Sequence, residues 1–153
     1  MRIVVLSDSH RSKRNLFDIV ELHMRDADLF IFLGDGEDDM DDVLALYPML
    51  KCERVAGNCD WYSTLPLFKE ITVSGKKVFF SHGHPFGVKH GYDDIIKEAR
   101  LRGADICLFG HTHNQYTKYD EGLYLMNPGS VASSEYGMID ITGSGIALIE
   151  ARI

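Results

Sequence analysis

The chain has 153 residues, 45% of them hydrophobic and 25% charged, which is enough apolar sequence for the core of one globular domain. Its 16 basic and 23 acidic residues give a net charge of −7, which argues against long nucleic acid or an anionic membrane surface as a partner. No apolar stretch approaches the length of a membrane span. We therefore expect a single domain over residues 1–153 that does not contact membranes.

The beginning of the chain and its cysteines predict a cellular setting. The first apolar run is short and no small-residue cleavage site follows it, unlike a signal peptide. Cys52, Cys59 and Cys107 are odd in number and lack zinc-finger spacing. Both features favour a reducing, cytoplasmic location.

The first third of the chain alternates short apolar runs with amphipathic segments. Residues 2–6 and 29–33 are predicted to be buried strands, and a third strand is expected to end near residues 54–56. Helices are predicted over residues 13–24 and 40–47. This order predicts a parallel sheet with right-handed crossovers.

The pattern of predicted strands and helices changes in the rest of the chain. A hairpin turning at residues 74–76 is predicted first, then an amphipathic helix over 93–102 and an apolar strand over 106–109. Short strands with tight turns then follow, predicted to be antiparallel: 115–120, 123–127, 135–141 and 146–151. We expect two packed mixed sheets flanked by helices, which is a four-layer α/β/β/α sandwich.

Chemically active residues follow the apolar strands at repeated places. The clusters are Asp8-Ser9-His10, Gly34-Asp35-Gly36, Gly57-Asn58-Cys59-Asp60, Ser81-His82-Gly83-His84 and Gly110-His111-Thr112-His113. Any one of them could be an ordinary turn or helix cap. Because ligands bind beyond the carboxyl ends of strands in open parallel sheets, the repetition predicts one shared site.

The residue types in these clusters indicate metal binding. Four histidines, carboxylates and an amide oxygen form a mixed nitrogen and oxygen set, which suits Mn, Fe, Co, Ni or Zn better than Ca or Mg. The set is too large for one tetrahedral site, so we expect two metals sharing a bridging carboxylate. The candidate ligands are Asp8, His10, Asp35, Asn58, His82, His111 and His113.

Neighbouring acidic residues have simpler explanations. Asp38, Asp39, Asp41 and Asp42 are expected to form a solvated face at a helix start, where they suit the helix dipole. Glu37 is an alternative candidate for ordering the loop around Asp35.

In their order along the chain, these clusters resemble the calcineurin-like metallophosphoesterases. That family carries D-x-H, G-D, G-N, a histidine and G-H-x-H, and every piece is present here. Gly57–Asp60 and Asn127–Ser130 are similar to segments of its small bacterial and archaeal phosphodiesterases. The second segment is either a turn beneath the site or part of the pocket floor.

The resemblance implies a role for each candidate. Asp8, His10 and His113 would hold one metal, and Asn58, His82 and His111 the other, with Asp35 bridging both. Manganese is the first expectation, with Ni, Co, Fe or Zn as alternatives. The implied reaction is hydrolysis of a small phosphodiester by a two-metal-activated hydroxide, with Asn58 also catalytic.

The sequence departs from the family at one catalytic position. Most members have a histidine after the asparagine, thought to protonate the leaving group, whereas this chain has Cys59. A thiol is a poor replacement for imidazole at neutral pH. We predict that His84 takes part of this work and that Cys59 and His84 face the substrate. Alternatively, no strong general acid exists, and good leaving groups are preferred.

Other functions compete with this interpretation. The retromer scaffolding subunit resembles these enzymes yet acts through protein contacts, and a phosphomonoesterase or protein phosphatase would use the same fold. Retention of every expected ligand favours the enzyme.

Little chain remains for a cap over the site, so we expect the site to be open. A cyclic nucleotide, a nucleotide-like diester and a phospholipid fragment all remain candidate substrates. Both a monomer and a homo-oligomer remain candidate assemblies.

Overall fold

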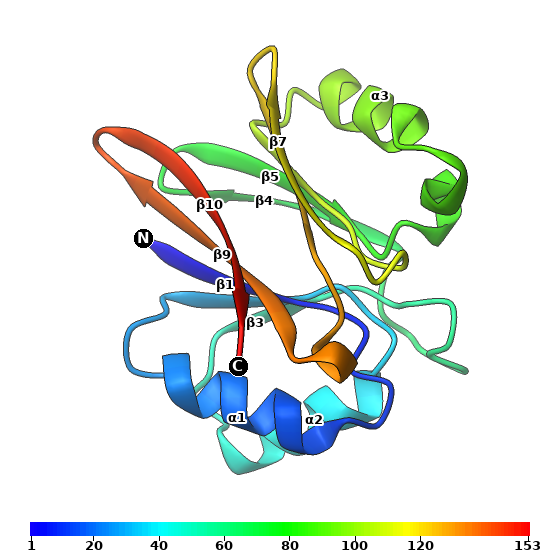
Figure 1. Ribbon diagram of the computed structural model, residues 1–153, viewed down its shortest axis with the longest axis vertical. Helices are drawn as coiled ribbons and strands as arrows, with labels where there is room; N and C mark the ends of the chain where they lie inside the picture. The colour runs from blue at the N-terminus through cyan, green and yellow to red at the C-terminus, as the bar shows by residue number, and fades with distance from the viewer.

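A computed structural model describes residues 1–153 (Figure 1). The strands are β1 (Arg2–Leu6), β2 (Leu29–Phe32), β3 (Cys52–Arg54), β4 (Phe68–Val73), β5 (Lys76–Ser81), β6 (Ile106–Leu108), β7 (Gln115–Asp120), β8 (Leu123–Pro128), β9 (Glu135–Thr142) and β10 (Gly145–Arg152). The α-helices are α1 (Lys13–His23), α2 (Glu37–Leu46) and α3 (Asp93–Leu101). Short 3₁₀ helices are η1 (His84–Phe86), η2 (Val88–His90) and η3 (Val131–Ser133).

The strands form two five-stranded mixed sheets. The first has the order β10-β9-β1-β2-β3 and the second β4-β5-β6-β8-β7. Strands β1, β2 and β3 run parallel, as do β5, β6 and β8. The carboxyl ends of these two parallel sets carry the five clusters that the sequence analysis identified.

Alternation along the strands builds the layers. Ile3 and Val5 of β1 lie in the core between the sheets, while Val4 and Leu6 pack with α1 and α2 on the outer face. The outer face of the second sheet is covered by α3 (Figure 1). The four-layer α/β/β/α sandwich is thereby confirmed.

The last four strands form two antiparallel pairs, as predicted, but the two pairs belong to different sheets. Strands β7 and β8 pair antiparallel in the second sheet, and β9 and β10 do so in the first. The chain therefore crosses between the sheets after β8. Strand β8 also pairs parallel with β6, which the sequence did not predict.

Helix α2 begins three residues earlier than predicted. Its first turn contains Glu37, Asp38 and Asp39, and the N–H groups of Gly36 and Glu37 donate to the carboxylate of Asp60 at 2.9 and 3.0 Å. Such donors lack helical partners, and a carboxylate from another loop satisfies them here. No helix in the structure is both long and apolar enough to cross a membrane.

Candidate metal centre

Six of the seven candidate ligands meet where the two sheets bring their carboxyl ends together. Asp8 and His10 follow β1, and Asp35 follows β2. His82 follows β5, while His111 and His113 follow β6. Both sheets therefore contribute side chains to one centre.

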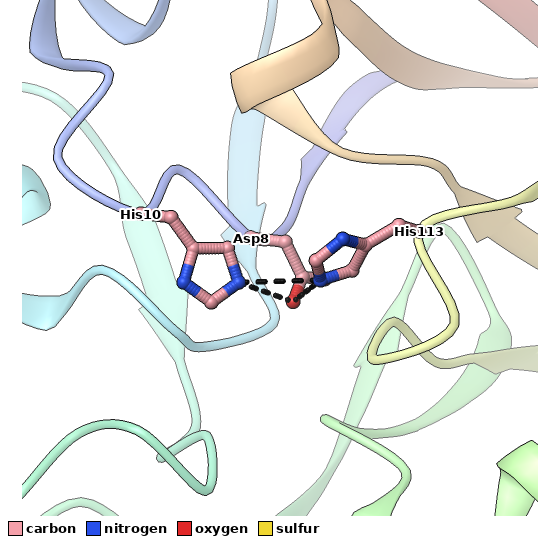
Figure 2. Close-up of side chains that lie close together, drawn as sticks. All are labelled: Asp8, His10 and His113. Carbon is pink, nitrogen blue, oxygen red and sulfur yellow. Dashed lines mark hydrogen bonds and ion pairs between the residues drawn. The ribbon is translucent and has the colours of Figure 1, made fainter.

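One group of side chains contains Asp8, His10 and His113 (Figure 2). Asp8 Oδ1 lies 3.0 Å from His113 Nε2 and 3.3 Å from His10 Nε2. The two imidazole nitrogens are themselves 3.2 Å apart. Three potential donor atoms thus face a common point.

A second group contains Asp35, His82 and His111. His82 Nε2 lies 3.2 Å from both Asp35 Oδ2 and His111 Nδ1. The two groups adjoin, because Asp35 Oδ2 is 3.7 Å from His10 Nε2 in the first group. Asp35 is therefore the side chain that borders both.

The chemistry of these atoms fits divalent transition metals. Asp8 Oδ1 is fully buried yet forms no hydrogen bond, although buried carboxylates normally have partners. Two pairs of imidazole nitrogens lie 3.2 Å apart, and each pair needs a proton or a cation between its lone pairs. Imidazole and carboxylate donors together suit cations such as Mn²⁺ or Zn²⁺.

Hydrogen bonds outside the centre orient the atoms that face it. Asp8 Oδ2 accepts from Ser7 Oγ at 2.5 Å and from the His111 N–H at 3.1 Å, which leaves Oδ1 for the centre. Asp35 Oδ1 accepts from the Cys59 N–H at 2.7 Å. His82 Nδ1 lies 2.8 Å from the Leu33 carbonyl and donates to it, so Nε2 is the free nitrogen.

The backbone at the centre is strained. Asp8, His10, Asp35, His111 and His113 all have left-handed φ values, between 42° and 70°. Residues with a Cβ rarely adopt this region, and such strain clusters at functional sites. The backbone also packs too closely for larger residues, because a Cβ on Gly57 would lie 2.1 Å from Asp35 Oδ1.

Burial and neighbouring charge shift the pKa values of the centre. Burial lowers the pKa of His111 to about 4, with the charge of His82 acting in the same direction. Burial opposes ionisation of Asp35, but hydrogen bonding and the charge of His82 hold its pKa below the usual range. At neutral pH the centre therefore offers an ionised carboxylate and an unprotonated His111, both able to bind a cation.

Three further predicted site residues lie at the edge of the centre. Asn58 is exposed, and its amide nitrogen lies 3.4 Å from Cys59 Sγ, with no hydrogen bond to the other six candidates. Cys59 Sγ lies within 4.8 Å of ligand atoms of His10 and Asp35. The ring of His84 is centred 5.5 Å from that of His82, and its buried Nδ1 has no hydrogen-bond partner.

Asp60 was not predicted as a site residue, yet it fixes the loop around Asp35. Its carboxylate accepts from the N–H groups of Asp35, Gly36, Glu37 and Gly57 at 2.7–3.0 Å. Glu37, the alternative candidate for ordering this loop, contributes its backbone N–H to this set of bonds. The available signal was an aspartate three residues after Gly57, the spacing of a side chain that closes a tight turn.

Asp39 also differs from its prediction. It was expected on a solvated face but is only 3% exposed. Its carboxylate accepts from Ser9 Oγ at 2.6 Å and from the Arg11 N–H at 2.9 Å. Asp39 therefore anchors the loop that carries His10.

The Asn127–Ser130 segment joins the loops of both sheets. Asn127 Nδ2 donates to the Gly110 carbonyl at 3.0 Å and to Thr112 Oγ1 at 2.9 Å. Ser130 Oγ donates to the Asp8 carbonyl at 2.8 Å. These bonds support the loops that carry the candidate ligands, and a role in the pocket floor stays a prediction.

An edge of two sheets lined by imidazoles and carboxylates is the kind of centre that metal-dependent phosphoesterases use. Residues 1–144 match the family model of the calcineurin-like phosphoesterase superfamily domain. The chain belongs to this family, as the resemblance implied.

Similar proteins are found in bacteria and archaea. The probable metallophosphoesterase YsnB of Bacillus subtilis is 31% identical over 132 residues, which cover 86% of this chain and 75% of that protein. The phosphodiesterase YfcE of Escherichia coli K12 is 28% identical over 105 residues, which cover 59% of this chain and 53% of that protein.

Solved structures share the fold over the full chain. A conserved uncharacterized protein of Streptococcus pneumoniae TIGR4, a predicted phosphoesterase, aligns with a TM-score of 0.85 at 24% identity, covering 99% of this chain and 88% of that one. Vps29 of Entamoeba histolytica complexed with Zn²⁺ aligns with a TM-score of 0.77 at 22% identity, covering 100% and 98%.

Proposed function

We propose that this protein is a divalent-metal-dependent phosphodiesterase acting on a small diester at a two-metal centre. One observation carries the proposal. Two adjoining groups of imidazole and carboxylate atoms converge, and the buried Asp8 Oδ1 among them has no hydrogen-bond partner. A single cation would occupy only one of these two groups of side chains and would leave the other group without a bound cation.

The two groups divide the candidate ligands between two ions. Asp8, His10 and His113 would hold one ion, and His82 and His111 would hold the other together with Asn58. Asp35 borders both groups and would bridge the ions. When bound, such ions supply Lewis acidity that activates water and neutralises charge on the phosphoryl oxygens.

The protein's own residues position these donors and handle a proton. Ser7, Cys59 and Leu33 hold Asp8, Asp35 and His82 in fixed orientations through the hydrogen bonds described above. In the overall reaction a water oxygen joins phosphorus, one P–O ester bond breaks, and the departing oxygen takes a proton. We assign that proton donation to His84, which lies beside His82 and His111. Burial and the charge of His82 lower the pKa of His84, so its minor protonated form would be the donor.

A diester is favoured over a monoester by two considerations. The relative YfcE is named a phosphodiesterase. In addition, Cys59 stands where the family's proton-donating histidine is expected, and burial followed by the charge of Asp35 raises the pKa of its thiol. A protonated thiol is a weak acid catalyst, and a monoesterase of this family would normally keep the histidine, so its replacement favours a diester.

Metal stoichiometry and substrate preference test this proposal together. Protein stripped with a chelator should bind two Mn²⁺ per chain by calorimetry, and it should hydrolyse bis(p-nitrophenyl) phosphate faster than p-nitrophenyl phosphate. One ion per chain, or faster monoester turnover, would contradict the proposal. Binding of metal without any turnover would instead favour a scaffold on the same fold.

A further inference from the structure

A hollow of about 490 Å³ opens beside the candidate metal centre. Its wall includes His10, Asp35 and Cys59, and it extends along residues 60–63 and the first turn of α2. Residues 60–63 belong to the long loop between β3 and β4, which projects on the right of Figure 1. A group attached to a phosphate at the centre would enter this hollow.

Two large aromatic side chains on that loop have no packing role. Trp61 is 80% exposed and Tyr62 is fully exposed, and both line the hollow. Tyr62 also has a φ of 64°, which is strained for a residue with a bulky side chain. Adjacent exposed aromatics beside a candidate site indicate a binding surface rather than part of the core.

The base of the loop is rigidly tied to the centre. Asp60 directly precedes the two aromatics, and its carboxylate accepts from the N–H of Asp35 at 2.8 Å and of Gly57 at 2.7 Å. The backbone that carries the aromatic pair is therefore anchored beside the proposed bridging carboxylate. This is the arrangement that a site needs to bind both ends of one ligand.

The polar groups of the hollow narrow the kind of ligand. Arg11 lines the hollow next to His10 and forms no ion pair. The carboxylates of Asp39 and Asp60 are occupied by hydrogen bonds, and Glu37 Oε2 is buried, whereas Asp38 is exposed and its carboxylate accepts no hydrogen bond. The hollow thus offers aromatic faces, one cation near the centre and the exposed acceptor of Asp38.

Resting on the proposed function, we infer that the hollow binds the nucleoside of a phosphodiester whose phosphate lies at the metal centre. The base stacks on Trp61 or Tyr62, and an amino group of the base donates to Asp38. Arg11 lies at the phosphate end. An acyl chain would place apolar groups against the carboxylate of Asp38, and a second phosphate would be repelled by Glu37 and Asp38.

The chain provides its own reporter for this binding. Trp61 is the single tryptophan, so selectively excited tryptophan fluorescence reports on the hollow. Metal-loaded protein is titrated with adenosine 5′-monophosphate and with ribose 5-phosphate, which share the phosphate and differ by the base. We expect the adenosine compound to quench Trp61 and to bind about tenfold more tightly, as one base–aromatic stack requires.

Variants distinguish protein contacts to the base from protein contacts to the phosphate. Removal of the stacking partner should reduce the affinity ratio of the two compounds toward one, either in Tyr62→Ala or in Trp61→Ala, the latter measured by calorimetry. Arg11→Gln should weaken both compounds by a similar factor and keep the ratio. Tyr119→Ala removes an aromatic that is 60% exposed on β7, away from the hollow, and should change neither affinity.

Equal affinities for the two compounds in the unaltered protein would overturn the inference. A ratio that persists in both the Tyr62 and the Trp61 variants would also overturn it. The hydrolysis assay reports separately on the proposed function. Turnover of an activated diester without base preference would refute only the nucleoside subsite, whereas base preference without turnover would refute only the enzyme.

Discussion

Individual residues at the centre are fixed by contacts that depend on the folded chain. Side-chain types and spacing were enough to predict Asp8, His10, Asp35, His82, His111 and His113 as neighbours, because each follows an apolar strand. Asp60 and Asp39 were not predicted in their roles. Apart from the Gly57 N–H, three residues before Asp60, their partners lie 23–30 residues away in sequence, and no local pattern predicts such contacts.

Gly57 offers a direct test of close packing at the centre. A Cβ at this position would collide with Asp35 Oδ1 at 2.1 Å, so Gly57→Ala should displace the proposed bridging carboxylate. We expect a loss of about 10- to 100-fold in metal affinity, as for other supporting contacts, measured by calorimetry. Gly143→Ala is the control, because a Cβ there meets nothing within 4 Å. Equal affinity in the two variants would show that the close packing is unimportant.

His84 is tested through the leaving group. If His84 protonates the departing oxygen, His84→Ala should slow esters of poor leaving groups by about 100-fold or more and spare an activated aryl diester. Steady-state rates for a series of leaving-group pKa values would measure the slope. An unchanged slope would remove His84 from catalysis and leave the centre without a strong general acid.

At the scale of elements, strands were predicted better than connections. Alternating or continuous apolar runs identified every strand to within about two residues, because burial on one or both faces imposes that pattern. The sequence predicted an antiparallel tail but not its division between the two sheets or the parallel β6–β8 pair, since strand pairing depends on tertiary packing that local patterns do not encode. The short helices η1, η2 and η3 have no periodicity long enough to be recognised.

The Asn127–Ser130 connection between the sheets should control metal binding from outside the centre. Asn127→Ala removes two donated hydrogen bonds that hold the Gly110–Thr112 loop. We expect Mn²⁺ affinity to fall by about 10- to 100-fold while the fold is kept. Asn15→Ala loses a comparable bond to the Val131 carbonyl, outside this loop, and should bind Mn²⁺ normally. Equal losses in both variants would indicate general destabilisation.

Strands β1 and β9 are linked by an ion pair that should make stability depend on pH. Arg2 donates to Asp140 at 2.8 and 2.9 Å, and these hydrogen bonds lower the carboxyl pKa below its ordinary value of 3.8. The stabilisation is therefore complete above that ordinary pKa and is lost as the pH falls through the lower folded value.

Asp140→Asn tests this dependence in metal-free protein. Denaturant midpoints of the unaltered protein should exceed those of the variant at neutral pH, and the gap should close under strongly acidic conditions. A gap that stays constant with pH would mean that the carboxylate charge contributes nothing.

At the scale of the whole molecule, two sheets of different strand order present their carboxyl ends to one centre. The acidic balance of −7 is partly explained by carboxylates that serve this centre and its supporting loops. Cations bound there would offset charge locally, so an anionic phosphodiester can approach an otherwise acidic protein.

One activity measurement tests whether the protein is a metal-dependent phosphodiesterase in which Asp35 bridges two ions. Protein stripped with a chelator is assayed on an activated aryl phosphodiester before and after addition of Mn²⁺, beside Asp35→Asn, which keeps the side-chain shape without the charge. We expect activity to return only when metal is added. In the Asp35→Asn variant activity should fall by more than about 100-fold, because loss of a contact that only supports a ligand costs about 10- to 100-fold. Activity without metal, or an equally active variant, would contradict a two-metal phosphodiesterase bridged by Asp35.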